Sequence, residues 1–304
     1  MSLNPCSCEA GKQNTQASRC KNLEQIARRL IIVPEFKNDG SKFDFANVAA
    51  ITETNIIAAI NAVNPNDRIY PLGKMEQVEE MRGDSMVQEF NSGNIAKIDD
   101  GKREFTAFIP LASPILEGKI KSWACHKFGV YIIDKMGNFV YNTDKETGLR
   151  VQPILIDENS LDVTYVTAKD NEVSGVMIKF KFRASVVDRL RRYIESSSLD
   201  FDALEDIYSL YDVSSSYSSI STTGFTATLK DEYGLPVEGL VISEFSLYNT
   251  TTSLAVVVTG LTETSRGVYA LTFAAQGSGN SLRLTPSKNG YDFSAVVSNL
   301  ITIP

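Results

Sequence analysis

Histidine is almost absent from this chain of 304 residues, which has one histidine, one tryptophan and four cysteines. One histidine cannot supply a metal site built from several histidines. The patterns G-x-x-x-x-G-K-[ST], G-x-G-x-x-G and G-x-S-x-G, which bind phosphates and dinucleotides or present a nucleophilic serine, do not occur. Because these enzyme signatures are missing, we expect that the protein is not an enzyme and that it uses no cofactor.

Long apolar runs are missing as well. No run approaches the roughly 18 apolar residues that a bilayer-spanning helix needs. Residues 1–21 have no apolar core of the kind that a signal peptide carries. We therefore expect a protein that is made in the cytoplasm and has no evident export signal.

An excess of positive charge is also lacking, since the net charge is −7 and the isoelectric point is near 5.0. Sequence-specific binding to nucleic acid normally needs a stripe of lysine and arginine that neutralises phosphates. An acidic surface repels DNA instead. The 43% of hydrophobic and 22% of charged residues are typical of a packed globular chain, long enough for two domains.

Three of the four cysteines, Cys6, Cys8 and Cys20, lie in the polar segment 1–21. A C-x-C pair with one further cysteine lacks the paired C-x-x-C spacing that marks zinc sites. The alternatives are a metal site or redox pair and a polar, flexible leader. We favour the leader and predict no metal site.

The remaining cysteine, Cys125, precedes the only histidine, His126. The segment 113–128 has helical spacing, with Ser113 as N-cap and Pro114 at the first helical position. Neighbours on a helix point about 100° apart, so these two side chains diverge and form no nucleophile–base hydrogen bond. We interpret the pair as the end of a structural helix and not as a catalytic pair.

The overall pattern predicts a mostly β chain with a few helices, of the α+β class. We predict a flexible leader over 1–21, an assembly domain over 22–212 that forms a β-sandwich or barrel, a Ser/Thr-rich linker over 213–223 and a C-terminal β-sandwich over 224–304. The helices are expected at 23–30, 51–65, 113–128, 185–195 and 200–211.

Two turn signals predict hairpins in the first domain. Asp100-Gly101 separates two extended runs, and Gly137-Asn138 follows the apolar strand 129–134. Strand 176–184 alternates cleanly between apolar residues and the basic residues Lys179, Lys181 and Arg183. The basic face is either a salt-bridging surface for an acidic partner or neighbouring subunit, or the solvated face of an edge strand. We predict assembly contacts at Asp99, Asp100, Lys102, Arg103, Lys179, Lys181 and Arg183.

The C-terminal part contains "TATLKDEYGLPVEGLVI" at 226–242 and "SRGVYALTF" at 265–273. These stretches resemble the bacterial Ig-like modules of the invasin type, with a strand that ends in Asp, a turn with Gly and Pro-Val, and a later Gly-x-Tyr. The resemblance covers about 80 residues and implies an Ig-like β-sandwich.

In the first domain, "DDGKREF" at 99–105 and "KSWACHKFGVYIIDKMGN" at 121–138 are similar to stretches in tail proteins of phages that infect Bacteroidetes. The order of long hairpin, capped helix, hairpin and further strands over roughly 22–195 resembles a tailed-bacteriophage tail tube protein. The leader has no counterpart in this resemblance.

The resemblance implies a structural virion protein that self-assembles. Its copies would form closed rings, normally hexamers, which stack into the tail tube together with other phage tail proteins. The long 69–110 hairpin would reach the adjacent ring, and an acidic lumen would let double-stranded DNA pass without specific binding. The Ig-like domains would project outward and bind glycans weakly, with avidity from many copies.

Other functions stay open at this stage. A capsid decoration or head fibre protein would also carry an Ig-like module but would dock on the capsid instead of stacking on itself. A glycan-binding surface adhesin would need an export route. We rank the tail tube first, another virion component second, an adhesin third and an enzyme last.

Overall fold

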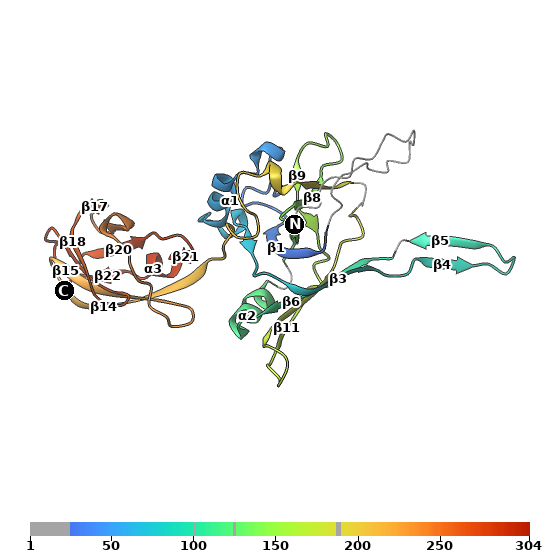
Figure 1. Ribbon diagram of the computed structural model, residues 1–304. Helices are drawn as coiled ribbons and strands as arrows, with labels where there is room; N and C mark the ends of the chain where they lie inside the picture. Colours follow the sequence, from blue (N-terminus) through green and yellow to red (C-terminus); the bar gives the residue numbers. More distant parts are fainter. Residues whose placement is uncertain (1–24, 100, 124–125, 187–189) are drawn as a thin grey trace. The chain divides into compact units, whose positions relative to one another are not determined.

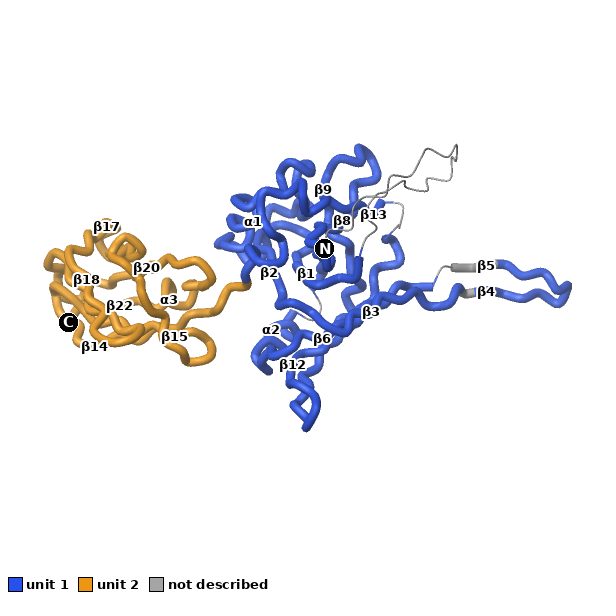
Figure 2. Tube along the Cα trace, viewed as in Figure 1, with its two compact units in different colours: residues 1–208 blue, residues 209–304 orange. Residues whose placement is uncertain are grey.

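Antiparallel β-sheets dominate the described part of the chain, and a few short helices connect them (Figure 1). The computed structural model describes residues 25–99, 101–123, 126–186 and 190–304. The predicted class, mostly β with a few helices, is confirmed. The chain divides into unit 1, Met1–Tyr208, and unit 2, Ser209–Pro304 (Figure 2).

The described residues of unit 1 form three sheets. The seven-stranded sheet has the order β13-β8-β7-β1-β2, with β10 paired to β7 and β9 paired to β8. Its strands are β1 Ala27–Pro34, β2 Tyr70–Pro71, β7 Phe128–Asp134, β8 Phe139–Thr143, β9 Val151–Gln152, β10 Ile154–Leu155 and β13 Arg191–Ile194. The four-stranded sheet has the order β11-β12-β6-β3 and contains β3 Glu76–Arg82, β6 Arg103–Pro110, β11 Asp162–Val166 and β12 Gly175–Lys181. The third sheet pairs β4 Met86–Glu89 with β5 Ile95–Asp99.

The two larger sheets of unit 1 share one hydrophobic core. Leu30 and Ile32 of β1 belong to the same buried cluster as Phe105 of β6 and Ile178 of β12. The rings of Phe105 and Phe180 stack with centroids 4.9 Å apart. Each such side chain contributes about 1.5–3 kcal/mol when it is fully buried.

Two α-helices lie within the part of unit 1 that the structure describes. Helix α1, Glu53–Ile60, begins after Thr52, whose hydroxyl accepts the N–H of Asn55. Helix α2, Pro114–Ser122, begins after Ser113, whose hydroxyl accepts the N–H of Ile115. Both confirm predicted helices, but α2 ends at Ser122, six residues before the predicted end: His126 lies in a bend and Phe128 begins β7. Short 3₁₀ helices lie at Val48–Ala50, Pro65–Asp67, Ser196–Ser198 and Ile242–Glu244.

Alternation predicted β12 correctly. Val176, Ile178 and Phe180 are buried, while Lys179 and Lys181 are exposed. The hairpin at Gly137-Asn138 also forms, because β7 and β8 pair antiparallel on either side of it. Gly137 has a φ of +79°, a conformation that glycine adopts without a steric penalty.

Three predicted helices of unit 1 are wrong. The described end of segment 23–30 belongs to β1, a strand whose Leu30, Ile31 and Ile32 are all buried between neighbouring strands. The end of segment 185–195 is β13, which pairs with β8 at the sheet edge. A short apolar run buried on both faces has no strand alternation, so its spacing resembles that of a helix.

Segment 200–211 forms turns, with Phe201, Ala203 and Ile207 buried. Arg29 donates from Nη1 to the Leu204 carbonyl over 3.1 Å. In a helix that carbonyl would accept the N–H four residues later. The buried guanidinium therefore takes an acceptor that the predicted helix would need.

Unit 2 consists of two sheets around one core. The first has the order β18-β19-β15-β14-β21 and the second the order β17-β16-β20-β22. The strands are β14 Tyr211–Ser221, β15 Gly224–Asp231, β16 Phe245–Asn249, β17 Leu254–Val256, β18 Val258–Ser265, β19 Val268–Phe273, β20 Ser281–Pro286, β21 Tyr291–Asp292 and β22 Ile301–Thr302, with helix α3 at Ser294–Ser298.

The predicted linker 213–223 is wrong, because most of it is strand β14, which pairs with β15 from Val213 to Ser221. Serine side chains are small and tolerate the exposed positions of a strand at the surface. The polar composition therefore reflects a solvent-facing strand. The unit boundary falls earlier, between Tyr208 and Ser209.

The residues that carry the Ig-like resemblance meet in unit 2. The Tyr269 hydroxyl donates to the Val237 carbonyl over 2.8 Å and accepts the Leu240 N–H over 3.2 Å. Burial raises the pKa of Tyr269 to about 12. A Cβ on Gly267 would lie 2.8 Å from the Cβ of Pro236, so a larger residue would push the Pro-Val turn away.

Candidate functional site

The most distinctive feature of unit 1 is a long β-hairpin, residues 76–110, which we call the arm. Its base belongs to the four-stranded sheet, where β3 pairs with β6. Its outer part is β4 and β5, which pair only with each other and lead away from the larger sheets (Figure 1). At the tip, Phe90 donates its N–H to the Asn94 carbonyl, and Gly93 has a φ of +76°.

This geometry corrects the hairpin predicted at Asp100-Gly101. The strands on either side, β5 and β6, have different partners: β5 pairs with β4, and β6 pairs with β3 and β12. The true turn lies at Phe90–Asn94. Asp-Gly is a strong hairpin signal, but here it lies between the outer and the basal part of one arm strand.

Exposed apolar side chains follow the arm. Met81, Val87, Phe90 and Ile95 are each between 46% and 67% exposed. The stretch from Gly83 to Ala96 contains the acidic residues Asp84 and Glu89 and no lysine or arginine. Met81 lies on β3, at the edge of the four-stranded sheet, and Val87, Phe90 and Ile95 lie on the two-stranded outer part. Exposed apolar side chains that follow one another in this way are typical of a surface that another protein covers.

The two strands of the arm lie unusually close to each other at Gly83 and Gly101, where the basal part (β3 and β6) meets the outer part (β4 and β5). A Cβ on Gly101 would lie 1.7 Å from the carbonyl oxygen of Gly83, so no side chain fits there. The Gly83 N–H donates to the Lys102 carbonyl over 3.0 Å. These backbones can approach only because residue 101 is glycine.

We therefore expect Gly101→Ala to separate the arm strands at this point. Trypsin should then cleave faster at Lys102 and Arg103, as measured by mass spectrometry over a time course. Gly118→Ala is the matched control, because a Cβ on Gly118 meets nothing within 4 Å and alanine favours helix α2. Equal cleavage of both variants would contradict the expectation.

Four of the predicted assembly cations bind carboxylates of their own chain. Lys102 pairs with Asp157 at 3.0 Å, Arg103 with Glu80 at 3.1 Å, and Lys181 with Glu104 at 2.5 Å. Arg191 also binds Glu80, at 2.7 Å. The pairs with Asp157, Lys181 and Arg191 connect the base of the arm to the body of unit 1, while the Arg103–Glu80 pair joins its two strands, β6 and β3. Exposed pairs contribute about 0–1 kcal/mol each, so they orient the arm more than they stabilise the unit.

The fourth of the predicted assembly cations is Arg183. It forms a bidentate pair with the buried Glu35, with both N–O distances at 2.9 Å. The Glu35 carboxylate raises the pKa of Arg183. Lys179 is exposed and lies across from Asp162 and Thr106 in the sheet. Asp99 ends β5, but its side chain and all of Asp100 lie outside the described residues. Assembly contacts at these seven residues stay a prediction.

A second candidate site is a cavity of about 830 Å³ in unit 1. It is lined by two loops, which follow β1 and β8, and by part of the segment before β13. The lining residues include Glu35, Lys37, Lys42, Asp44, Asn142, Thr143, Asp144, Lys145, Glu146, Arg150 and Ser185. Phe45 and Val151 exchange backbone hydrogen bonds of 3.0 Å, which join the first loop to β9. This cavity was not among the sites predicted from the sequence.

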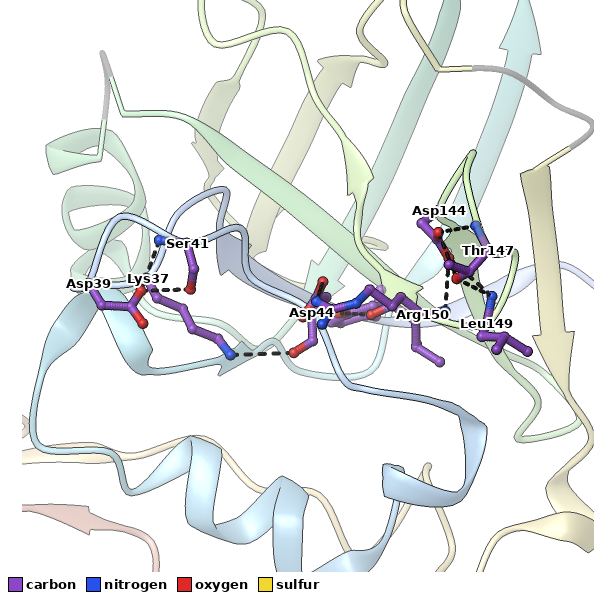
Figure 3. A network of polar contacts seen from close by, with 10 residues as sticks. Lys37, Asp39, Ser41, Asp44, Asp144, Thr147, Leu149 and Arg150 are labelled. Carbon is purple, nitrogen blue, oxygen red and sulfur yellow. Dashed lines mark hydrogen bonds and ion pairs between the residues drawn. The ribbon is translucent and has the colours of Figure 1, made fainter.

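Polar contacts order both loops (Figure 3). Arg150 Nη1 lies 2.6 Å from Asp44 Oδ2 and connects the loops. Lys37 Nζ lies 3.5 Å from the Asp44 carbonyl and 5.4 Å from the centroid of the Phe43 ring. Asp39 accepts from both the N–H and the hydroxyl of Ser41.

Two buried oxygens beside the cavity accept no hydrogen bond. Asn142 is 8% and Thr143 is 5% exposed, and Asn142 Oδ1 and Thr143 Oγ1 have no partner. A buried polar group without a partner costs about 1–3 kcal/mol. Both residues are at the end of β8, where the strand leads into the cavity loop.

The Asp144 carboxylate holds the second loop closed. It accepts the N–H groups of Thr147, Leu149 and Arg150 over 2.7, 3.0 and 3.0 Å, and the Thr147 hydroxyl as well (Figure 3). The N–H of Thr147 is the largest cause that lowers the pKa of Asp144, which lies far below the ordinary value.

The sign of this shift predicts the response of the loop to acid. A carboxylate with a lowered pKa favours the closed loop at neutral pH and loses that effect only as pH falls through its folded pKa. We expect the amide shifts of Thr147 and Leu149 to stay unchanged at pH 4, where an ordinary aspartate is about half protonated. NMR titration would measure this, and a transition near pH 4 would contradict it.

The interpretation of Cys125 and His126 as the end of a structural helix is tested only in part, because Cys125, like Cys6, Cys8 and Cys20, lies outside the described residues, and helix α2 ends before both, at Ser122. His126 is exposed, and its Nδ1 lies 3.3 Å from the Trp123 carbonyl. No group of three or more His, Cys, Asp or Glu residues within the described ranges could hold a metal ion. In the same ranges no helix has both the length and the apolar composition that crossing a membrane requires.

Comparison with known proteins adds no assignment. No family model matches the chain, and no curated protein matches it.

Proposed function

We propose that this chain is a structural virion protein whose copies assemble into stacked rings and form the tube of a phage tail. The observation that carries the proposal is the arm, a ribbon with exposed Met81, Val87, Phe90 and Ile95. The proposed binding partner of the arm is a second copy of the chain. Burial of these side chains against the next ring would provide the driving force.

Further features support a subunit of this kind. Ion pairs with Asp157, Lys181 and Arg191 fix the base of the arm to the rest of unit 1, so the arm is oriented before it binds. β11 lies at an edge of the four-stranded sheet and offers a strand that a neighbour in a closed ring could extend. The net charge of −7 suits a lumen that double-stranded DNA passes without binding. The proposed place of the protein is the virion, with other tail proteins as partners.

Unit 2 would serve as an Ig-like decoration. Tyr211 and Tyr233 are nearly half exposed, with ring centroids 6.0 Å apart, and Tyr291 lies 6.2 Å from Tyr211. Rings of this kind have apolar faces and polar tips, a combination that suits weak glycan binding. This cluster is the observation that favours the alternative, a glycan-binding adhesin or a capsid decoration or head fibre protein.

Negative-stain electron microscopy and light scattering of the full-length protein at rising concentration test the proposal. We expect rings or hollow tubes. A chain that stays monomeric at every concentration, together with binding in a glycan array, would favour the adhesin instead.

A further inference from the structure

Leu111, the residue after β6, is an exposed apolar residue with a backbone conformation that leucine rarely adopts. Its φ is +59°, in the left-handed region, and it is 81% exposed. Among the described residues, the other non-glycine residues with positive φ are Gln77, Ser219 and Ser253, which are all polar. Both the left-handed backbone and the contact of the side chain with water are unfavourable for leucine in the free chain. Backbone strain of this kind is typical of sites that bind a partner.

Two further exposed apolar residues lie near Leu111 in the fold. The Leu111 N–H donates to the Ser174 carbonyl over 2.8 Å, and the residue before Ser174 is Val173, which is 52% exposed. Ile115, in the first turn of α2, is also exposed. We call Leu111, Ile115 and Val173 the far-end patch.

The far-end patch and the arm lie at opposite ends of the four-stranded sheet. β6 begins at Arg103, at the base of the arm, and ends at Pro110, directly before Leu111. β12 pairs with β6 and has Gly175 opposite Pro110, so Val173 lies at the same end as Leu111. In Figure 1 the arm leads away from one end of β6 and α2 follows the other. A strand of this length spans about 25 Å. Each copy therefore presents exposed apolar side chains at both ends of one sheet.

We propose that the far-end patch receives the arm of a second copy, a head-to-tail contact that rests on the tube function proposed above. Residues 83–96 of the arm contain two carboxylates and no lysine or arginine. Two arms in contact would bring four carboxylates together, which disfavours a symmetric contact between arms. The segments that contain the patch, 111–127 and 167–174, have four lysines and three acidic residues, so the arm meets no excess of negative charge there.

A contact between two different surfaces has a consequence for assembly. When the arm of one copy binds the far-end patch of the next, the first copy keeps its patch free and the second keeps its arm free. The same contact can therefore repeat without limit along one direction, as a stacked tube requires. The cost of holding Leu111 in its conformation is offset only when the arm covers it.

Leu111→Asn in the full-length protein tests the role of the patch. Asparagine adopts the left-handed conformation more readily than leucine, so the midpoint of thermal unfolding, followed by Trp123 fluorescence, should not fall. The concentration needed for assembly, measured by light scattering, should rise at least about tenfold because the burial of one leucine is lost. Val63→Asn is the matched control, since Val63 is 91% exposed outside the patch, and it should assemble like the unchanged protein. A lower midpoint for Leu111→Asn would show that Leu111 stabilises its own chain and would overturn the proposal.

Opposite charges identify the arm as the occupant of the patch. Phe90→Asp and Leu111→Lys should each weaken assembly, and the protein with both changes should assemble at a lower concentration than either single variant. Phe90→Asp with Val63→Lys is the control and should show no such recovery. If the losses of Phe90→Asp and Leu111→Lys add as those of distant sites do, the arm does not bind this patch.

The two proposals fail in different ways. Assembly of the unchanged protein together with equal assembly of Leu111→Asn would overturn the far-end contact and leave the tube function standing. An unchanged protein that stays monomeric at every concentration would overturn both.

Discussion

Full-length protein that carries both Phe90→Asp and Ile95→Asp should stay monomeric at concentrations at which the unchanged protein forms rings or tubes. Both side chains are exposed on the arm, Phe90 at its turn and Ile95 at the start of β5. Burial of one such side chain contributes about 1.5–3 kcal/mol. A loss of about 3 kcal/mol at each contact raises the concentration needed for assembly about 100-fold. Light scattering and electron microscopy measure that concentration.

Val63→Asp is the matched control for this experiment. Val63 is 91% exposed in unit 1, after helix α1, and lies outside the arm. It should assemble like the unchanged protein, which shows that one more surface charge does not prevent association. If the double variant assembles as well as the control does, the arm is not the contact between copies.

The sequence predicted those parts of the fold in which local signals and tertiary packing agree. Ser113 and Pro114 begin helix α2 as expected, and the alternation in β12 survives because one face of it is buried and the other exposed. Ser/Thr caps and strict alternation act within a few residues, so one segment of sequence contains the whole signal.

The failures have a physical cause in contacts between distant segments. β1 pairs with β7, about 100 residues later, and is buried on both sides. The spacing of apolar residues within β1 therefore predicts neither its pairing nor its burial. The turns at 200–211 depend on Arg29, which lies about 175 residues earlier. The serine-rich composition of β14 is typical of a linker, which is why a linker was predicted. The composition contains no information on the pairing of β14 with β15.

The candidate sites also combine features that have a local signal in the sequence with features that depend on distant segments. A long hairpin over 69–110 was predicted, but its turn was placed at Asp100-Gly101 because the stronger local signal is there, while the chain turns at Phe90–Asn94. The cavity could not be predicted from the sequence because its lining residues Lys42, Asn142 and Lys145 come from segments about 100 residues apart. The Asp144-x-x-Thr147 spacing is a local signal of a side chain that closes a turn, and it was not used to predict an ordered loop there.

The largest loss of stability should follow from Asp134→Ala, at the end of β7. Asp134 is fully buried, and its Oδ1 accepts the N–H groups of Met136 and Asn138 over 2.8 and 2.9 Å. Its Oδ2 accepts the Gln25 N–H over 3.1 Å and the Asn138 Nδ2 over 2.8 Å. Alanine leaves these buried donors without an acceptor, and hydrogen bonds to a charged group contribute about 1.5–3 kcal/mol each. We expect the free energy of unfolding of unit 1 to fall by about 3–5 kcal/mol.

Asp134→Asn separates the loss of charge from the loss of the acceptor. Its amide keeps one oxygen for Met136 and Asn138, but its NH₂ group would face the donors of Gln25 and Asn138, so we expect a loss nearly as large as with alanine. Urea unfolding followed by tryptophan fluorescence reports on unit 1 alone, because Trp123 is the only tryptophan of the chain. Asn249→Ala, which removes a buried amide from unit 2, is the control and should leave that transition in place. An unchanged midpoint for both Asp134 variants would show that the hairpin at Gly137-Asn138 does not depend on this carboxylate, and that backbone pairing of β7 with β8 holds it.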